Sequence, residues 1–231
     1  MNSLAARMYG VVRRPRATFA AILQIPSWLP VLAITTAITF LCAMAFLSTD
    51  VGRQALVDQW ERTSTAFGQP VDDASYARME ERAASGGAGL LYAAATALGY
   101  GPLLVFGISA LLFLVLKPRH SYGQVVAVVA YAGVILALRQ LIATPIDYIQ
   151  ESLASPTTLV RMVPMLDEAS PVARFLGVID LFVVWWIVVL AIGISVLYQR
   201  SPRRLALALA GAYLVLALLA ALAMAVSGGA A

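Results

Sequence analysis

Asp180 is the residue of this sequence best placed to do chemistry inside a membrane. It stands between two apolar stretches, residues 175–179 and 181–198. A carboxylate at such a depth costs several kcal/mol unless it is paired or hydrated, so it is retained for a structural or a functional reason. The sequence therefore predicts that Asp180 either pairs with a cation of the protein or binds an ion or a proton.

Arg139 is the expected partner of Asp180. It lies 19 residues beyond His120, and Asp180 lies 20 residues before Arg200. On antiparallel helices of 1.5 Å rise per residue, these offsets place both side chains at similar depth. We favour the structural interpretation, in which an intramembrane polar pair fixes the register of two helices, over an ion-binding or proton-binding Asp180.

The residue sets of common hydrolases are missing. The sequence has one histidine, His120, and one cysteine, Cys42. A zinc protease needs two histidines on one helix face, a serine intramembrane protease needs a histidine within a span, and a thiolate metal cluster needs several cysteines. Asp147 and Asp180 lack the glycine-containing context of aspartyl membrane proteases. We therefore expect no enzyme, no catalytic residue, no metal and no cofactor.

The elements that position these residues are long uncharged apolar runs. Each reaches the roughly 20 residues that a helix needs to cross a bilayer. Hydrophobic residues make up 61% of the sequence and charged residues 12%, about half the charged share of a soluble domain. The predicted fold is an all-α integral membrane protein, a five-span transmembrane helix bundle with short interfacial helices. The expected spans are about 28–48, 87–116, 121–144, 177–198 and 205–226.

The remaining segments are predicted to carry short helices. Residues 1–27 form a cytoplasmic interfacial segment before the membrane domain, residues 28–226. The outer helical loop, 49–86, contains a helix capped by Asp72, and its first part, 51–67, is expected to continue the first span outward. The second outer loop, 145–176, is rich in proline.

The second predicted span contains a break. Gly99, Gly101 and Pro102 interrupt its helix, and the proline removes a backbone donor near mid-membrane. A discontinuous helix can mark a transporter site, but such proteins show a matching break in a repeated half. Because this sequence shows no such repeat, we interpret the break as a kink for helix packing.

Charge sets the predicted orientation. Nine of the sixteen Lys and Arg residues lie in three short segments, 1–27, 117–120 and 199–204. All twelve acidic residues lie in the two longer loops, 49–85 and 139–180. Positive segments stay in the cytoplasm, so we expect a cytoplasmic N-terminus and an outside C-terminus. The heavy use of Arg and Ala suggests a bacterial inner membrane, and no nucleic acid is needed to explain the basic charge.

Three segments resemble the Yip family, the Ypt/Rab-interacting membrane proteins, in its bacterial branch. The first is residues 14–19 followed by Ile22 and 26–30, the second is 121–132, and the third is 179–182 with Trp185 and 191–194. The resemblance implies five spans and a cytoplasmic N-terminus. The positions that carry it are Pro15, Phe19, Pro26, Tyr131, Asp180, Phe182, Trp185 and Gly193.

The absence of a catalytic set and the resemblance together predict a non-enzymatic membrane scaffold, an organiser of other membrane proteins or lipids. Its expected partners are membrane lipids, an unidentified membrane protein and a second copy of the chain. The alternative is a small transporter or channel subunit that uses Asp180.

Overall fold

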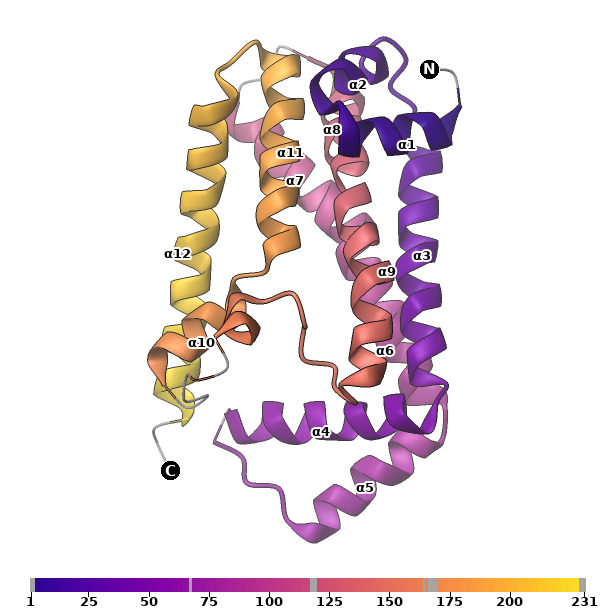
Figure 1. Cartoon of the computed structure of the whole chain (residues 1–231), viewed down its shortest axis with the longest axis vertical. Coiled ribbons are helices and arrows are strands. Elements are labelled where there is room, and N and C mark those ends of the chain that lie inside the picture. Colours follow the sequence, from indigo (N-terminus) through magenta and orange to yellow (C-terminus); the bar gives the residue numbers. More distant parts are fainter. Residues whose placement is uncertain (1–2, 67, 117–119, 164, 166–169, 229–231) are drawn as a thin grey trace. The chain divides into compact units, whose positions relative to one another are not determined.

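The structure is a computed structural model of the chain, and it describes residues 3–66, 68–116, 120–163, 165 and 170–228. This described part is helical and contains no strand, apart from one isolated bridge between Thr158 and Asp180. The predicted all-α fold is confirmed (Figure 1). In chain order the elements are α1 (Leu4–Arg13), α2 (Pro15–Ile22), α3 (Leu29–Leu47), α4 (Asp50–Ala66), α5 (Asp73–Ala84), α6 (Gly87–Leu98), the π-helical η1 (Gly99–Leu103), α7 (Leu104–Val115), α8 (Tyr122–Ala132), α9 (Val134–Ile149), the 3-10 helix η2 (Leu159–Met162), α10 (Pro171–Val178), α11 (Leu181–Tyr198) and α12 (Pro202–Gly228).

Five helical stretches are long and apolar enough to cross a membrane, with mean hydropathies between 2.1 and 2.6. Two of them are compound, because α6 continues through η1 into α7 and α8 is followed by α9. The protein is therefore an integral membrane protein with five apolar helices. The stretches are Leu29–Leu47, Gly87–Val115, Tyr122–Ile149, Leu181–Tyr198 and Pro202–Ala223.

The chain divides into two compact units, and each is described by itself. The first comprises Met1–Phe40, Thr96–Gln140 and Phe182–Ala212, and the second comprises Leu41–Ala95, Leu141–Leu181 and Tyr213–Ala231. Ten of the sixteen Lys and Arg residues belong to the first unit, which has no Asp or Glu. The other six, together with all twelve acidic residues, belong to the second. The units thus carry opposite net charge.

In the first unit α8 is the buried helix. A capping box starts it, with Gln124 N–H donating to the Ser121 hydroxyl and the Gln124 side chain accepting from Ser121 N–H. Every residue from Val125 to Ala132 is buried. The predicted short N-terminal helices, α1 and α2, pack against α8. Of the basic segment 117–120, only His120 lies within the described residues, and its ring packs edge-on against Tyr198 at 5.2 Å.

The kink region of the second span also lies in the first unit. Gly101 has a non-helical backbone (φ −91°, ψ −106°) where α6 passes through η1 into α7. A side chain on Gly101 would overlap the hydroxyl of Thr36 on α3, whereas nothing lies within 4 Å of the corresponding position on Gly99. A glycine at position 101 therefore lets the kinked segment η1 approach α3 closely.

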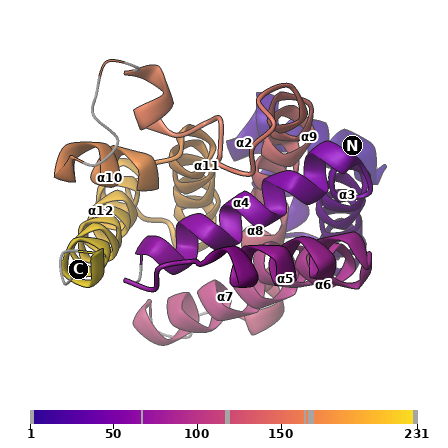
Figure 2. The same cartoon turned by 90° about the horizontal axis from the view of Figure 1, so that it is seen from below.

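In the second unit the loop between the first two apolar stretches, predicted to lie outside, forms a helical hairpin, which we call the outer hairpin. A tight turn follows α3, and a side chain on Gly52 would overlap the carbonyl of Phe46. The expectation that residues 51–67 continue the first span is therefore wrong, because α4 is a separate helix after this turn. It lies beside α5 (Figure 1 and Figure 2). Gln54 Nε2 on α4 donates to Tyr76 Oη on α5 at 2.8 Å. Asp72 caps α5 as predicted.

The two largest differences from the predicted span boundaries are at the end of α9 and the start of α11. The helix α9 runs through Pro145 to Ile149, although proline removes one backbone donor from a helix. The helix α11 begins at Leu181, because Ile179 takes an extended conformation (φ −86°, ψ 109°) that ends α10. Asp180 consequently lies in a short extended segment just before the fourth apolar helix.

Candidate functional site

Asp180 is buried between α10 and α11, with 5% of its surface exposed. The backbone on either side of it pairs with the preceding loop. Leu159 N–H donates to the carbonyl of Ile179 at 2.9 Å, and Leu181 N–H donates to the carbonyl of Thr157 at 3.1 Å. These two bonds hold the extended segment against residues 157–159 and fix where the Asp180 side chain starts.

The Asp180 carboxylate is bound by two hydroxyl groups. Its Oδ2 accepts from Thr157 Oγ1 at 2.6 Å and from Ser155 Oγ at 3.0 Å. Thr157 is itself buried. Hydrogen bonds to a charged oxygen are about twice as strong as neutral ones, so this contact ties residues 155–157 to the start of α11.

Tyr213 of α12 holds the same segment from its backbone side. Its hydroxyl donates to the carbonyl of Val178 at 2.7 Å and accepts from the N–H of Asp180 at 3.1 Å. One phenol therefore pairs the last carbonyl of α10 and the N–H of Asp180, two backbone groups at the end of that helix. We call Ser155, Thr157, Asp180 and Tyr213 the Asp180 cluster. It links three chain segments of the second unit that are distant in sequence.

The members of the Asp180 cluster are joined by hydrogen bonds to one another and to the neighbouring backbone. The carboxylate accepts from the hydroxyls of Ser155 and Thr157, and Tyr213 bonds the backbone beside it. Among the described residues, no three His, Cys, Asp or Glu side chains are grouped so as to hold a metal ion. Asp147 is also buried and belongs to the same unit. Arg139 belongs to the first unit, so its pairing with Asp180 stays a prediction.

The resemblance positions include a second, tightly packed group in the first unit. Phe19 of α2 is fully buried, and its ring lies against Gly193 of α11. A side-chain carbon on Gly193 would lie 3.1 Å from the Phe19 ring and 2.7 Å from Val128 of α8. These distances are too short for an unstrained contact, so glycine makes room for the phenylalanine. Phe19, Val128 and Gly193 thus join α2, α8 and α11.

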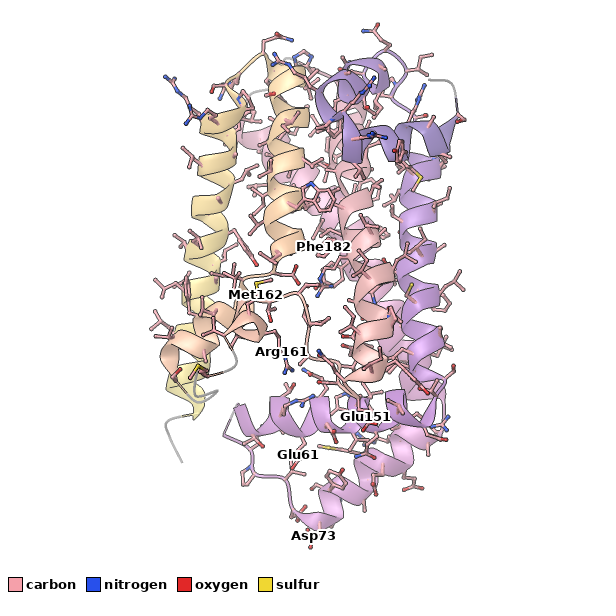
Figure 3. The ribbon with its side chains drawn as sticks, viewed as in Figure 1. Glu61, Asp73, Glu151, Arg161, Met162 and Phe182 are labelled. Atoms are coloured by element: carbon pink, nitrogen blue, oxygen red, sulfur yellow. The ribbon has the colours of Figure 1, made fainter. Side chains whose placement is uncertain are left out.

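The other resemblance positions lie in packed contacts or at helix ends. Tyr131 is fully buried on α8, and Phe182 packs against Trp185 with ring centroids 5.8 Å apart. Phe182 marks the start of the fourth apolar helix (Figure 3). Pro15 opens α2, where the missing N–H would have had no helical partner. Pro26 lies in the turn between α2 and α3.

The N-terminal helices present a basic surface. Arg13, Arg14 and Arg16 are exposed, while Val11, Phe19 and Ile22 of the same helices are fully buried. Arg7 ties the segment to the turn that follows α2, because its guanidinium reaches the carbonyl of Ile25 at 3.4 Å and the Ser27 hydroxyl at 3.5 Å. We call α1 and α2, with these exposed arginines, the N-terminal platform.

Sequence reasoning missed several residues of both groups. Ser155, Thr157 and Tyr213 were not expected beside Asp180, and Val128 was not expected beside Gly193. Ser and Thr in a proline-containing loop are common, and a lone Tyr in an Ala-Leu helix has many packing roles. No pattern along the chain brings these residues together, because their contacts depend on how the loop folds back.

Comparison with known proteins gives one match. The Yip1 domain matches residues 9–224, nearly the whole chain and all five apolar stretches. A search of curated proteins and a search of solved structures each found no match. The match includes Phe19, Gly193 and the whole Asp180 cluster.

Proposed function

The chain belongs to the Yip1 domain family, and on that premise we propose that it acts without catalysis, as a membrane scaffold that organises other membrane proteins or lipids. The observation that carries this proposal is the N-terminal platform. It presents Arg13, Arg14 and Arg16 on helices whose opposite side is anchored by Phe19 in the first unit. An anchored basic surface can hold a partner in a fixed orientation, which a flexible basic tail cannot do.

The charge of the first unit supports the same proposal. Arg200, Arg203 and Arg204 are exposed at the turn between α11 and α12, at the same end of this unit as α1 and α2 (Figure 1). With no acidic residue in the unit, these side chains add to one positive field. Basic clusters beside a membrane attract anionic headgroups, each residue contributing about 1 kcal/mol. They also suit an acidic face of a partner protein.

We infer that this end faces the cytoplasm, with the N-terminus inside and the C-terminus outside, in a bacterial inner membrane. Positively charged short segments are retained in the cytoplasm, which supports this orientation. The hydrogen bonds around Asp180 support a structural role for that residue rather than transport. The partners that we propose are anionic lipids, an unidentified membrane protein and a second copy of the chain.

The test is capture from native membranes in lipid nanodiscs, followed by mass spectrometry of the bound proteins and lipids. The platform variant carries Arg13→Gln, Arg14→Gln and Arg16→Gln. The control variant carries the same change at three exposed arginines of the second unit, Arg62, Arg78 and Arg161. We expect a discrete set of partners with the wild type and the control variant, and loss of that set with the platform variant.

Two results would overturn the proposal. Equal capture by the platform variant and the wild type would show that the arginines do not recruit the partners. A pH-driven or ion-driven flux through the purified protein in liposomes, abolished by Asp180→Asn, would replace the scaffold with a transporter.

A further inference from the structure

The second unit contains an open pocket of about 840 Å³ where the outer hairpin meets the second apolar helix. Its walls come from three helices. Trp60, Thr63 and Ser64 belong to α4, Met79 and Arg82 belong to α5, and Leu91, Tyr92 and Ala95 belong to the first turns of α6. Ser85, in the turn after α5, and Gly87 and Ala88, at the start of α6, complete it. No residue of the Asp180 cluster lines this pocket.

Polarity changes along the pocket wall. The residues that come before Gly87 include the polar side chains Thr63, Ser64, Arg82 and Ser85, whereas Leu91 and Ala95 follow it. Gly87 is also the first residue of the second membrane-spanning stretch. These four polar side chains therefore come from the segments before the span, beside Trp60 and Met79, whereas Leu91 and Ala95 lie on the span itself, beside Tyr92.

The depth of the apolar part matches the outer layer of a bilayer. From Gly87 to Ala95 the helix rises about 12 Å. The headgroup layer on one side of a bilayer is roughly 5 to 8 Å thick. A molecule in the pocket would thus reach through the headgroup layer into the first part of the hydrocarbon. Leu91, which is 72% exposed, offers an apolar surface at that depth.

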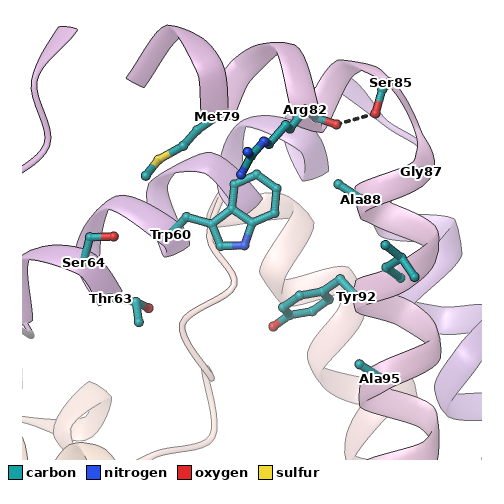
Figure 4. Close-up of a pocket in the computed structure, with 11 residues that line it drawn as sticks. Trp60, Thr63, Ser64, Met79, Arg82, Ser85, Gly87, Ala88, Tyr92 and Ala95 are labelled. Carbon is teal, nitrogen blue, oxygen red and sulfur yellow. Dashed lines mark hydrogen bonds between the residues drawn. The ribbon is translucent and has the colours of Figure 1, made fainter. Parts of the chain in front are cut away.

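The charge and aromatic residues of the pocket indicate an anionic occupant. Arg82 is the charged residue among those that line it, and the neighbouring Glu61, Glu80 and Glu81 do not line it. Trp60, Arg82 and Tyr92 come from three different helices and point toward the same space (Figure 4). Tryptophan and tyrosine are enriched at the depth where headgroups meet acyl chains, and guanidinium groups bind phosphate with paired hydrogen bonds.

We propose that this pocket binds one anionic phospholipid, with its phosphate at Arg82, its glycerol region between Trp60 and Tyr92, and an acyl chain along Leu91 and Ala95. The outer hairpin then acts as a lipid clamp at the start of the second span. The proposal is independent of the N-terminal platform, because every residue that it uses lies in the second unit.

Native mass spectrometry of the full-length protein tests the site. The purified protein is exchanged into detergent and titrated with phosphatidylglycerol. The mass spectrum then gives the number of lipid molecules that each protein retains. Arg82→Gln is compared with Arg78→Gln, a matched change one turn earlier on α5 whose arginine bonds Ser75 at 2.8 Å and does not line the pocket. A hydrogen bond to a charged group contributes enough that its loss weakens binding about tenfold or more. We expect that weakening with Arg82→Gln and none with Arg78→Gln.

Two further arms identify the ligand chemistry. Phosphatidylcholine has the phosphate and the chains but no net charge, and inorganic phosphate has the charge but no chains. The proposal predicts retention of phosphatidylglycerol well above phosphatidylcholine, and no competition by inorganic phosphate at millimolar concentration. Leu91→Ser is expected to weaken phosphatidylglycerol binding without changing the helical content measured by circular dichroism. Equal retention of the two lipids, competition by phosphate alone, or unchanged binding by Arg82→Gln would each overturn the proposal.

Discussion

Phe19 and Gly193 lie against each other in the first unit, and the phenylalanine ring together with Val128 fills the space that a side chain on the glycine would need. This contact anchors α2 of the N-terminal platform to α11, an apolar membrane-spanning stretch. It also explains two of the positions on which the family resemblance depends. A bulky aromatic on a surface helix and a glycine in a span are complementary parts of one packing interaction.

Gly193→Ala should destabilise the protein. Alanine normally stabilises a helix by up to about 1 kcal/mol relative to glycine, but overpacking a filled site costs about 1–3 kcal/mol. The matched control is Gly107→Ala in α7, where nothing lies within 4 Å of the new carbon. Thermal unfolding in nanodiscs should give a lower Tm for Gly193→Ala than for Gly107→Ala. Adding Val128→Ala to Gly193→Ala should raise the Tm part of the way back. If the Tm of Gly193→Ala equalled that of the control, the described packing would be contradicted.

Gly101→Ala should be costly for a related reason. The new carbon would overlap the hydroxyl of Thr36, whose oxygen is buried with no hydrogen-bond partner in the described part of the chain. Gly99→Ala, in the same π-helical segment, meets nothing within 4 Å and serves as the control. We expect Gly101→Ala to lower the Tm, and Thr36→Ala to restore it. If Gly99→Ala were the more damaging change, close packing at the kink would not be the cause.

Asp180→Ala should destabilise the second unit, because it removes the acceptor of two hydroxyl groups, one of them on the buried Thr157. Leaving a buried polar group unsatisfied costs about 1–3 kcal/mol. Thr157→Val removes the same hydrogen bond, so it should lose much of the same stability. The double variant should therefore lose less free energy of unfolding than the two single variants lose in sum. Strict additivity in the measured free energies of unfolding would show that the hydrogen bond is not coupled as described.

Asp72 should make the α5 helix sensitive to acid. Its pKa is lowered because the Ser75 side chain and the Ser75 N–H, at 2.8 Å, hydrogen-bond to the carboxylate. Because the pKa of Asp72 is lower in the folded state, the charged cap stabilises α5 fully when the pH is above the ordinary pKa of an aspartate. This contribution is lost as the pH falls through the lowered pKa. Helicity followed by circular dichroism should fall in acid for the wild type and less for Asp72→Asn, which caps without titrating. An identical acid response in both proteins would argue against the cap.

The orientation can be tested because Cys42 is the sole cysteine. In a Cys42→Ser background, single cysteines replace the exposed residues Ala17 on α2 and Glu80 on α5. An impermeant maleimide should label the Glu80→Cys protein in intact cells, and the Ala17→Cys protein only after the membrane is opened. The reverse pattern would invert the topology.

Much of the fold could be predicted from composition and charge. Five apolar runs and capping residues such as Asp72 are local features that can be read directly from the sequence. The start of α11 could not be predicted, because an apolar stretch before Asp180 has the composition of a helix. That stretch is helical up to Val178, where α10 ends, and only Ile179 before Asp180 is extended, because its carbonyl and the N–H of Leu181 pair with residues 157–159. The continuation of α9 past Pro145 was missed because proline usually ends a helix.

The candidate sites depended on contacts that have no signature along the chain. Asp180 could be singled out by its apolar surroundings, but its hydroxyl partners, Ser155 and Thr157, reach it only through the folded loop. The space for Phe19 requires knowing which helix faces Gly193. Spacing predicts which residues share a helix face, whereas packing between distant helices decides which faces meet.

The central claim is that the N-terminal platform contacts a partner, and photo-crosslinking in native membranes measures this most directly. A diazirine amino acid is placed at the exposed platform residues Ala17 and Ala20, and at the exposed Ala84 of α5 as a control. We predict discrete protein or lipid adducts at Ala17 and Ala20 that are absent at Ala84 and disappear when Arg13, Arg14 and Arg16 are changed to Gln. Adducts that are no more frequent at the platform than at Ala84, or that persist without the three arginines, would contradict the account.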